Sequence, residues 1–205
     1  MSFIKKKYKN ISQFSDDYIM NLANSMTKVD KSALTKILKI IENKIKNKKY
    51  LFVCGNGGSA AISNHLVCDY LKYMKTNNNL MPKIVSLSSS NELITAISND
   101  ISYNQIFSYQ LNVLGERGDL LLVISSSGNS QNIIEAIKVA RKKNIKVISF
   151  TGFNGGKVRK LSDYNLHFNY NNYGISEDLH HISMHLICQY IRMKYSKIDV
   201  KKVKF

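Results

Sequence analysis

The stretch YLFVCGNGGSAAISNH, from Tyr50 to His65, decides the fold of this chain. It passes from a short apolar run directly into glycines and a serine, and then into residues that favour a helix. In a parallel sheet a ligand binds beyond the carboxyl ends of the strands, where the following helices present unpaired N–H groups. The sequence therefore predicts an anion-binding turn here, because glycines let a charged group approach the backbone. Its polar groups come from Asn56, Gly57, Gly58 and Ser59.

Short apolar runs alternate with segments of helical spacing along most of the chain. The expected strands are residues 50–54, 83–87, 119–125, 146–152 and 165–170. The expected helices between them are residues 59–74, 91–98 continuing into 104–115, 130–144 and 157–163. Strands that alternate with crossover-length helices predict a parallel sheet that is covered on both faces.

Helical patterns also flank this central region. Residues 14–49 predict two helices that pack either on the core or on a neighbouring subunit. A last helix is expected over residues 176–195, with Ser176 as its N-cap and two acidic residues in its first turn. We therefore expect N-terminal helices over residues 1–49, an α/β domain over 50–195 and a basic tail over 196–205.

The charge of the chain is strongly positive. Its 205 residues, enough for one domain, include 30 Lys and Arg against 14 Asp and Glu, a formal net charge of +16. Three interpretations remain open: a solvated basic surface, attraction of a small anionic ligand, or binding of nucleic acid. No helix-turn-helix, RNA-binding or zinc-finger motif supports the last, so we expect no nucleic-acid partner.

The cysteines and the apolar runs indicate the cellular compartment in which the protein is expected. Cys54, Cys68 and Cys188 are too few and too separated for a disulfide framework. The longest apolar run, Leu120 to Ile124, is too short to span a bilayer, and the charged N-terminus lacks the apolar run of a secretory signal. We expect a cytoplasmic protein with reduced thiols and no membrane partner.

A second polar turn follows the third expected strand. In VISSSGNSQN the hydroxyls of four serines precede a helix start, and these are Ser125, Ser126, Ser127 and Ser130. Hydroxyls and free N–H groups at a helix terminus are suited to a phosphate monoester. Neither turn is a P-loop or a G-x-G-x-x-G motif, so we do not expect a nucleotide. The alternative is ordinary turn chemistry.

Two helices carry the residues that are suited to acid-base or metal chemistry. His65 and Asp69 lie four apart on the helix after the first turn and share one face. Glu177, His181 and His185 form a stripe on the last helix, with His180 beside it. If these faces meet, they form a cluster for proton transfer or for a divalent metal. The alternatives are a surface pair and a helix that is only partly buried.

The segments CGNGGSAAISNHLVCDYL, AISND, VISSSGNSQNIIEAIKVAR and TGFNGGKVRKLSD resemble the phosphoheptose isomerases of the sugar isomerase (SIS) domain superfamily, in order and spacing. The resemblance runs from about Leu34 to Tyr195. It implies a five-stranded parallel sheet flanked by helices, a flavodoxin-like three-layer sandwich, with an N-terminal helical extension. It also implies conversion of D-sedoheptulose 7-phosphate to D-glycero-D-manno-heptose 7-phosphate through an enediol. That reaction opens the synthesis of nucleotide-activated heptose for bacterial cell-surface polysaccharide (lipopolysaccharide or capsule).

The resemblance also implies roles for individual residues. Asp69 and His185 would be catalytic, and one zinc ion per subunit would be held by His65, Asp69, Glu177 and His185. The implied substrate-binding residues are Asn56, Gly57, Gly58, Ser59, Asp69, Asn99, Asp100, Ser125, Ser126, Ser127, Ser130 and Glu177. No nucleotide or redox cofactor is implied, and the assembly would be a homotetramer. His167 and His180 are interpreted as structural.

Two residues depart from the family pattern. Asp69 stands where the family has Glu, which shortens its reach by about 1.5 Å, and Glu177 stands where the family has Gln. The first departure suggests an alternative, an isomerase for another sugar phosphate. A further alternative is a non-catalytic SIS protein, similar to the relative that associates with the bacterial replication initiator. Asn99 and Asp100 have an alternative too, as a turn or helix cap.

Overall fold

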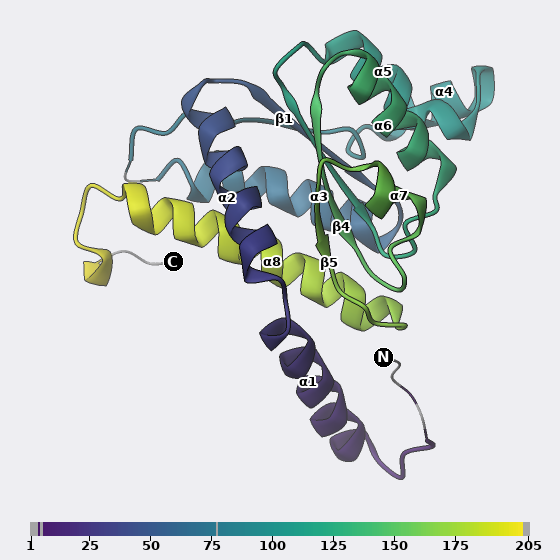
Figure 1. The fold of residues 1–205 in the computed structure, drawn as a ribbon, viewed down its shortest axis with the longest axis vertical. Helices are drawn as coiled ribbons and strands as arrows, with labels where there is room; N and C mark the ends of the chain where they lie inside the picture. Colours follow the sequence, from purple (N-terminus) through teal and green to yellow (C-terminus); the bar gives the residue numbers. More distant parts are fainter. Residues whose placement is uncertain (1–3, 5, 77, 203–205) are drawn as a thin grey trace.

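The fold is built on a single five-stranded sheet. The computed structural model describes residues 4, 6–76 and 78–202. The strands are β1 (Tyr50–Gly55), β2 (Lys83–Ser86), β3 (Leu120–Ser125), β4 (Lys146–Thr151) and β5 (Tyr164–His167). All pairings are parallel, in the order β2-β1-β3-β4-β5 (Figure 1). The predicted parallel sheet is therefore confirmed.

Eight α-helices surround the sheet in the described part of the chain. They are α1 (Ile11–Thr27), α2 (Lys31–Lys46), α3 (Gly58–Cys68), α4 (Asn91–Asp100), α5 (Ile106–Leu114), α6 (Gln131–Lys142), α7 (Gly156–Leu161) and α8 (Tyr173–Tyr195). A π-helix follows α3 at Asp69–Tyr73, and short 3₁₀ turns occupy Tyr103–Gln105 and Val200–Lys202.

The helices form one layer on each face of the sheet. Along β1 the side chains alternate, so that Leu51 and Val53 face one apolar cluster while Phe52 and Cys54 face the other. The first cluster includes buried residues of α2, α3 and α8, and the second includes buried residues of α4, α5, α6 and α7. This is the expected three-layer α/β sandwich.

The two N-terminal helices behave differently. α2 buries Ile37, Ile41 and Ile45 in the same cluster as the strands, so it packs on the sheet. α1 has no buried residue and extends away from the body of the molecule (Figure 1). Partly buried side chains of α1, among them Phe14 and Leu22, pack against the cluster that includes α8, and the Tyr18 hydroxyl donates to the Asp178 carboxylate at 2.5 Å.

Three expected helices have different boundaries. α8 begins at Tyr173 rather than Ser176, because the extended Asn172 caps it by accepting the Ile175 N–H group at 3.0 Å. The expected helix over residues 91–115 is interrupted after α4, where Ile101 leaves the helical conformation. The expected helix over residues 59–74 changes from α to π geometry at Asp69.

Part of each end of the chain is not described by the structure. Residues 203–205 of the expected basic tail and residues 1–3 and 5 of the N-terminal region lie outside the described residues. Within the described ranges, no helix combines the length and hydropathy that crossing a bilayer requires.

Candidate active site

The two polar turns meet at the carboxyl edge of the sheet. β1 and β3 are neighbours, although β2 lies between them in sequence, so the strand order reverses at this point. Ligands of open α/β sheets bind in the crevice at such a switch point. A cavity of about 280 Å³ lies here. Its lining is Asn56, Gly57, Gly58, Ser59, Ile124, Ser125, Ser126, Ser127, Ser130, Tyr173 and Glu177.

The two helices that start at this cavity lack a side-chain cap. The N-cap residues are Gly57 for α3 and Ser130 for α6, and neither side chain accepts an N–H group of its helix. The N-cap side chains of α1, α2, α4 and α8 accept such a group, whereas α5 and α7 also lack a side-chain cap. An anion in the cavity would therefore lie near two positive helix ends whose N–H groups are not bonded to the side chain of the N-cap residue.

Two of the hydroxyls in the serine turn already form hydrogen bonds with the backbone of that turn. The Ser125 hydroxyl accepts the Gly128 N–H group at 3.2 Å, and the Ser127 hydroxyl accepts that of Asn129 at 3.4 Å. The Ser126 hydroxyl is buried and has no hydrogen-bond partner among the described residues. A buried hydroxyl without a hydrogen-bond partner is destabilising. Ser126, and Ser130, whose side chain does not cap α6, are therefore the serines best placed to bind a ligand oxygen.

Glu177 reaches the same cavity from α8. Its carboxylate lies against Gly58, in the space that a Cβ atom at this position would occupy. Burial raises the pKa of Glu177, and the nearby Asp178 carboxylate raises it further. An acid with a raised pKa is better able to stay protonated beside an anion.

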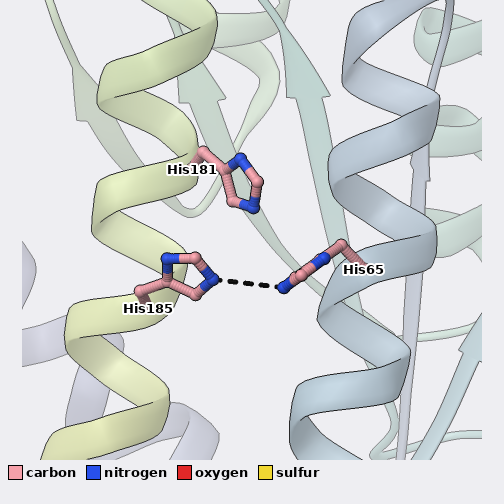
Figure 2. A group of neighbouring side chains, drawn as sticks. All are labelled: His65, His181 and His185. Atoms are coloured by element: carbon pink, nitrogen blue, oxygen red, sulfur yellow. Dashed lines mark hydrogen bonds between the residues drawn. The ribbon is translucent and has the colours of Figure 1, made fainter.

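A second group of side chains joins α3 to α8. The buried Asp69 carboxylate places one oxygen 3.4 Å from His65 Nε2 and the other 3.3 Å from His185 Nε2. The two Nε2 atoms are 3.2 Å apart (Figure 2). The predicted convergence of the early acid and the late imidazole is therefore present within one chain, and Asp69 reaches both rings although it is shorter than Glu.

His181 adds a third ring to this group. One ring nitrogen from each of His65, His181 and His185 lies within 4.8 Å of the others, an arrangement that could hold a metal ion. Figure 2 shows the His181 ring pointing from α8 toward the other two. Burial lowers the pKa of His181, and the His185 and His65 rings lower it further, which favours the neutral imidazole that binds metals.

The remaining histidines lie elsewhere. His180 is fully buried beside the rings of Phe150 and Phe168, and burial lowers its pKa to about 4. His167 lies on β5 with its Nδ1 atom 3.0 Å from the Thr151 hydroxyl. Their interpretation as structural residues stays a prediction.

Three predicted substrate-binding residues either lie off the cavity or already bond to other side chains in the described chain. Asn99 and Asp100 hydrogen-bond to each other at 2.9 Å on the exposed end of α4 and do not line the cavity. Asn56 lines the cavity, but its side chain already exchanges two hydrogen bonds of 2.9 Å with Asn132 and accepts one from Tyr103. Tyr103, Asn132 and Tyr173 were not predicted as site residues and carried no sequence signal, whereas His181 was part of the predicted stripe on the last helix but was given no role of its own.

Comparison with known proteins identifies the family of this chain. A model of the SIS domain family matches residues 16–152. The phosphoheptose isomerase of Aliarcobacter butzleri is 40% identical over 158 residues, which cover 77% of this chain and 83% of that protein. The chain belongs to the phosphoheptose isomerase family. Another family member, from Synechocystis, is 30% identical over 184 residues, covering 90% of this chain and 94% of its own.

The fold agrees with a solved structure of the family. The phosphoheptose isomerase from Neisseria gonorrhoeae superposes with a TM-score of 0.81 at 28% sequence identity, covering 89% of this chain and 97% of that one. The likeness extends over all three layers of the sandwich rather than over the sheet alone.

The zinc expected from the phosphoheptose isomerase family fits the donor group at Asp69. Zinc in proteins is bound tetrahedrally by imidazole and carboxylate groups at about 2.0–2.1 Å, which separates neighbouring donor atoms by about 3.3 Å. The His65 and His185 Nε2 atoms are 3.2 Å apart, and each lies at a similar distance from a different Asp69 oxygen, 3.4 Å from Oδ1 for His65 and 3.3 Å from Oδ2 for His185. Glu177, the fourth expected ligand, is not part of the histidine group and lies against Gly58.

Proposed function

We propose that this member of the phosphoheptose isomerase family interconverts D-sedoheptulose 7-phosphate and D-glycero-D-manno-heptose 7-phosphate. The observation that carries the proposal is the 3.3 Å approach of the Asp69 carboxylate to the His185 ring. An acid-base pair of this kind, between two helices whose first residues line a cavity with two positive helix ends, is suited to moving protons on a sugar that is held by its phosphate.

The phosphate binds in the cavity between the two turns. The N-termini of α3 and α6 supply N–H groups and favourable dipoles, and Ser126 and Ser130 donate hydroxyl hydrogens to the phosphate oxygens. Ser59, Ser125 and Ser127 complete the wall. This end of the site fixes the substrate so that its carbonyl end meets α8.

The chemistry is a transfer of one carbon-bound proton. Asp69 removes a proton from C1 of the ketose, the C1–H electrons form a C1=C2 double bond, and the C2 carbonyl oxygen accepts a proton from His185. The resulting cis-enediol loses the proton of its C1 hydroxyl to His185 as the aldehyde forms, and C2 takes the proton from Asp69. Both residues return to their starting states, and no redox cofactor is consumed.

Zinc belongs to the proposal as the metal of the site. Bound by His65, Asp69 and His185, it would hold α3 and α8 in place around the substrate. Glu177 was expected as a further ligand, but its carboxylate lies against Gly58.

The direct test is an assay of the purified protein with sedoheptulose 7-phosphate, followed by NMR for the aldose signal, with added chelator and with added zinc. The proposal expects aldose to accumulate in at least one of these conditions. Absence of turnover in all of them would remove the isomerase function.

One observation favours a second candidate, an isomerase for a different sugar phosphate. Glu177 places a carboxylate in the phosphate cavity where the family pattern has an amide. A negative group there changes which hydroxyls and which phosphate position fit. Parallel assays with five-, six- and seven-carbon sugar phosphates separate the two candidates, because the preferred substrate has the highest kcat/KM. The non-catalytic alternative predicts no turnover of any of them.

A homotetramer in the cytoplasm, working in heptose synthesis for cell-surface polysaccharide, completes the proposal. A larger cavity of about 860 Å³ lies between α2 and α8 and has an apolar wall. Its exposed apolar side chains include Leu186, Tyr190 and Met193. These exposed apolar side chains and the projecting helix α1 are surfaces that neighbouring subunits would bury, which supports the proposed tetramer. Sedimentation analysis at several protein concentrations tests the assembly.

A further inference from the structure

We propose that the fourth protein ligand of the metal site is His181, and that Glu177, which stands at the family's ligand position, serves the phosphate cavity instead. The inference rests on the zinc site of the proposed function and concerns only which side chains of this chain complete it. It gives a site of three histidines and one aspartate: His65, Asp69, His181 and His185.

The first argument is position along the helices. Glu177, His181 and His185 occupy successive turns of one face of α8, so His181 lies one turn closer to His185 than Glu177 does. The Glu177 carboxylate lies against Gly58 at the start of α3. His65 lies two turns further along α3, and two turns of α-helix rise about 11 Å. Glu177 is therefore directed to the opposite end of α3 from the metal ligands.

The second argument is the state of the His181 ring. Its Nε2 atom is buried and has no hydrogen-bond partner among the described residues. The ring centroid is 4.9 Å from that of His65 and 4.6 Å from that of His185. A buried ring nitrogen without a partner, facing two other imidazoles, is an unfilled donor position that a cation satisfies.

The third argument is the donor set. Three neutral imidazoles and one carboxylate form a complete tetrahedral shell for Zn²⁺. A complete shell has no open position for a sugar oxygen, so an ion bound this way holds α3 to α8 rather than contacting the substrate. Glu177 remains free to interact with the phosphate or with a sugar hydroxyl.

The test compares two substitutions on the same face of α8, His181→Leu and Glu177→Gln. Zinc affinity of the full-length chain is measured by competition with a chromophoric chelator in the absence of substrate, and Co²⁺ absorption reports the coordination geometry. We expect His181→Leu to weaken zinc binding at least tenfold and to change the cobalt spectrum. We expect Glu177→Gln to bind zinc within about twofold of the unmodified chain.

Three results would overturn the inference: no zinc binding by the unmodified chain, unchanged affinity in His181→Leu, or a tenfold loss in Glu177→Gln. Circular dichroism and thermal melting of the metal-free variants establish that each is folded. Because affinity is measured without substrate, the outcome is independent of the isomerase assay. Turnover without zinc binding removes this inference and the zinc of the proposed site but leaves the isomerase activity, and zinc binding without turnover removes the isomerase activity alone.

Discussion

The Asp69 carboxylate lies between two imidazoles, 3.3 Å from His185 Nε2 on α8 and 3.4 Å from His65 Nε2 on its own helix. Asp69 is the first residue of the π-helix that follows α3, and its side chain is 10% exposed. A π turn in an otherwise α-helical segment occurs frequently at functional sites. The carboxylate is therefore shielded from bulk water and positioned by two helices at once.

Restoring the family residue with Asp69→Glu should lower activity rather than raise it. The aspartate already contacts both rings, so an added methylene pushes the carboxylate about 1.5 Å beyond its present position. Misplacement on that scale costs about 10²-fold in kcat. Steady-state kinetics on sedoheptulose 7-phosphate measure the effect. An Asp69→Glu variant as fast as the unmodified chain would mean that the observed side-chain distances do not set the rate.

Removal of the Ser130 hydroxyl should weaken phosphate binding with little effect on the chemical step. Hydrogen bonds to charged groups contribute about 1.5–3 kcal/mol, so Ser130→Ala is expected to raise KM by about tenfold or more. Ser162→Ala is a matched control, because the Ser162 hydroxyl bonds the Val158 carbonyl far from the cavity. Equal KM values for the two variants would exclude Ser130 from the phosphate site.

Glu177 should make phosphate binding depend on pH. Its pKa is raised by burial and by Asp178, so the neutral form persists to a higher pH than in an exposed glutamate. As the pH rises through that pKa the carboxylate ionises and repels the phosphate. We expect Glu177→Gln to bind inorganic phosphate more tightly than the unmodified chain at pH 8, with a smaller difference at pH 5. Calorimetric titration at both values checks this, and weaker binding by Glu177→Gln at pH 8 contradicts it.

His180 should make the fold less stable in acid. Its pKa of about 4 in the folded chain lies below the ordinary value of 6.5, so the unfolded chain binds the proton more readily. Stability is therefore complete above about pH 6.5 and falls as the pH drops toward 4. Urea unfolding at pH 7 and pH 5 should show a loss of at least 1 kcal/mol in the free energy of unfolding. A His180→Gln variant should lose less over the same interval, and an equal loss would assign the effect to other groups.

Zinc should stabilise the folded chain. An ion that binds only the folded state at a hundredfold excess over its Kd adds about 2.7 kcal/mol. For a chain of this size that corresponds to a rise in Tm of roughly 5 to 10 °C. Thermal melting with zinc and with chelator measures the shift, and His65→Gln should abolish it. Identical melting temperatures with zinc and with chelator would argue against the metal site.

Much of the fold follows from local sequence patterns. Apolar runs such as Leu120 to Ser125 form strands because both faces of a parallel sheet are buried. The glycine and serine turns follow β1 and β3 because the chain must bend there and leave room for a ligand. The helix boundaries were less predictable, because Asn172 and Ser176 are both good N-caps and only the backbone conformation at Asn172 decides between them.

The individual site residues could be predicted from the sequence, but which side chains of α3 and α8 come together could not. The spacing of His65 and Asp69 places them on one face of a helix, and the resemblance pairs Asp69 with His185. The choice between Glu177 and His181 depends on how α3 crosses α8, which spacing along a single helix does not contain. The hydrogen bonds of Asn56 to Asn132 and Tyr103 likewise join segments far apart in sequence.

The most direct test of the central claim compares the unmodified chain with Asp69→Asn and His185→Gln in the conversion of sedoheptulose 7-phosphate, monitored by NMR. Stabilisation of each variant by inorganic phosphate in thermal melting verifies that the cavity is intact. We expect aldose formation by the unmodified chain and a loss of at least about 10²-fold in each folded variant. Near-normal turnover in either variant would contradict the assignment of Asp69 and His185 as the pair that moves the protons.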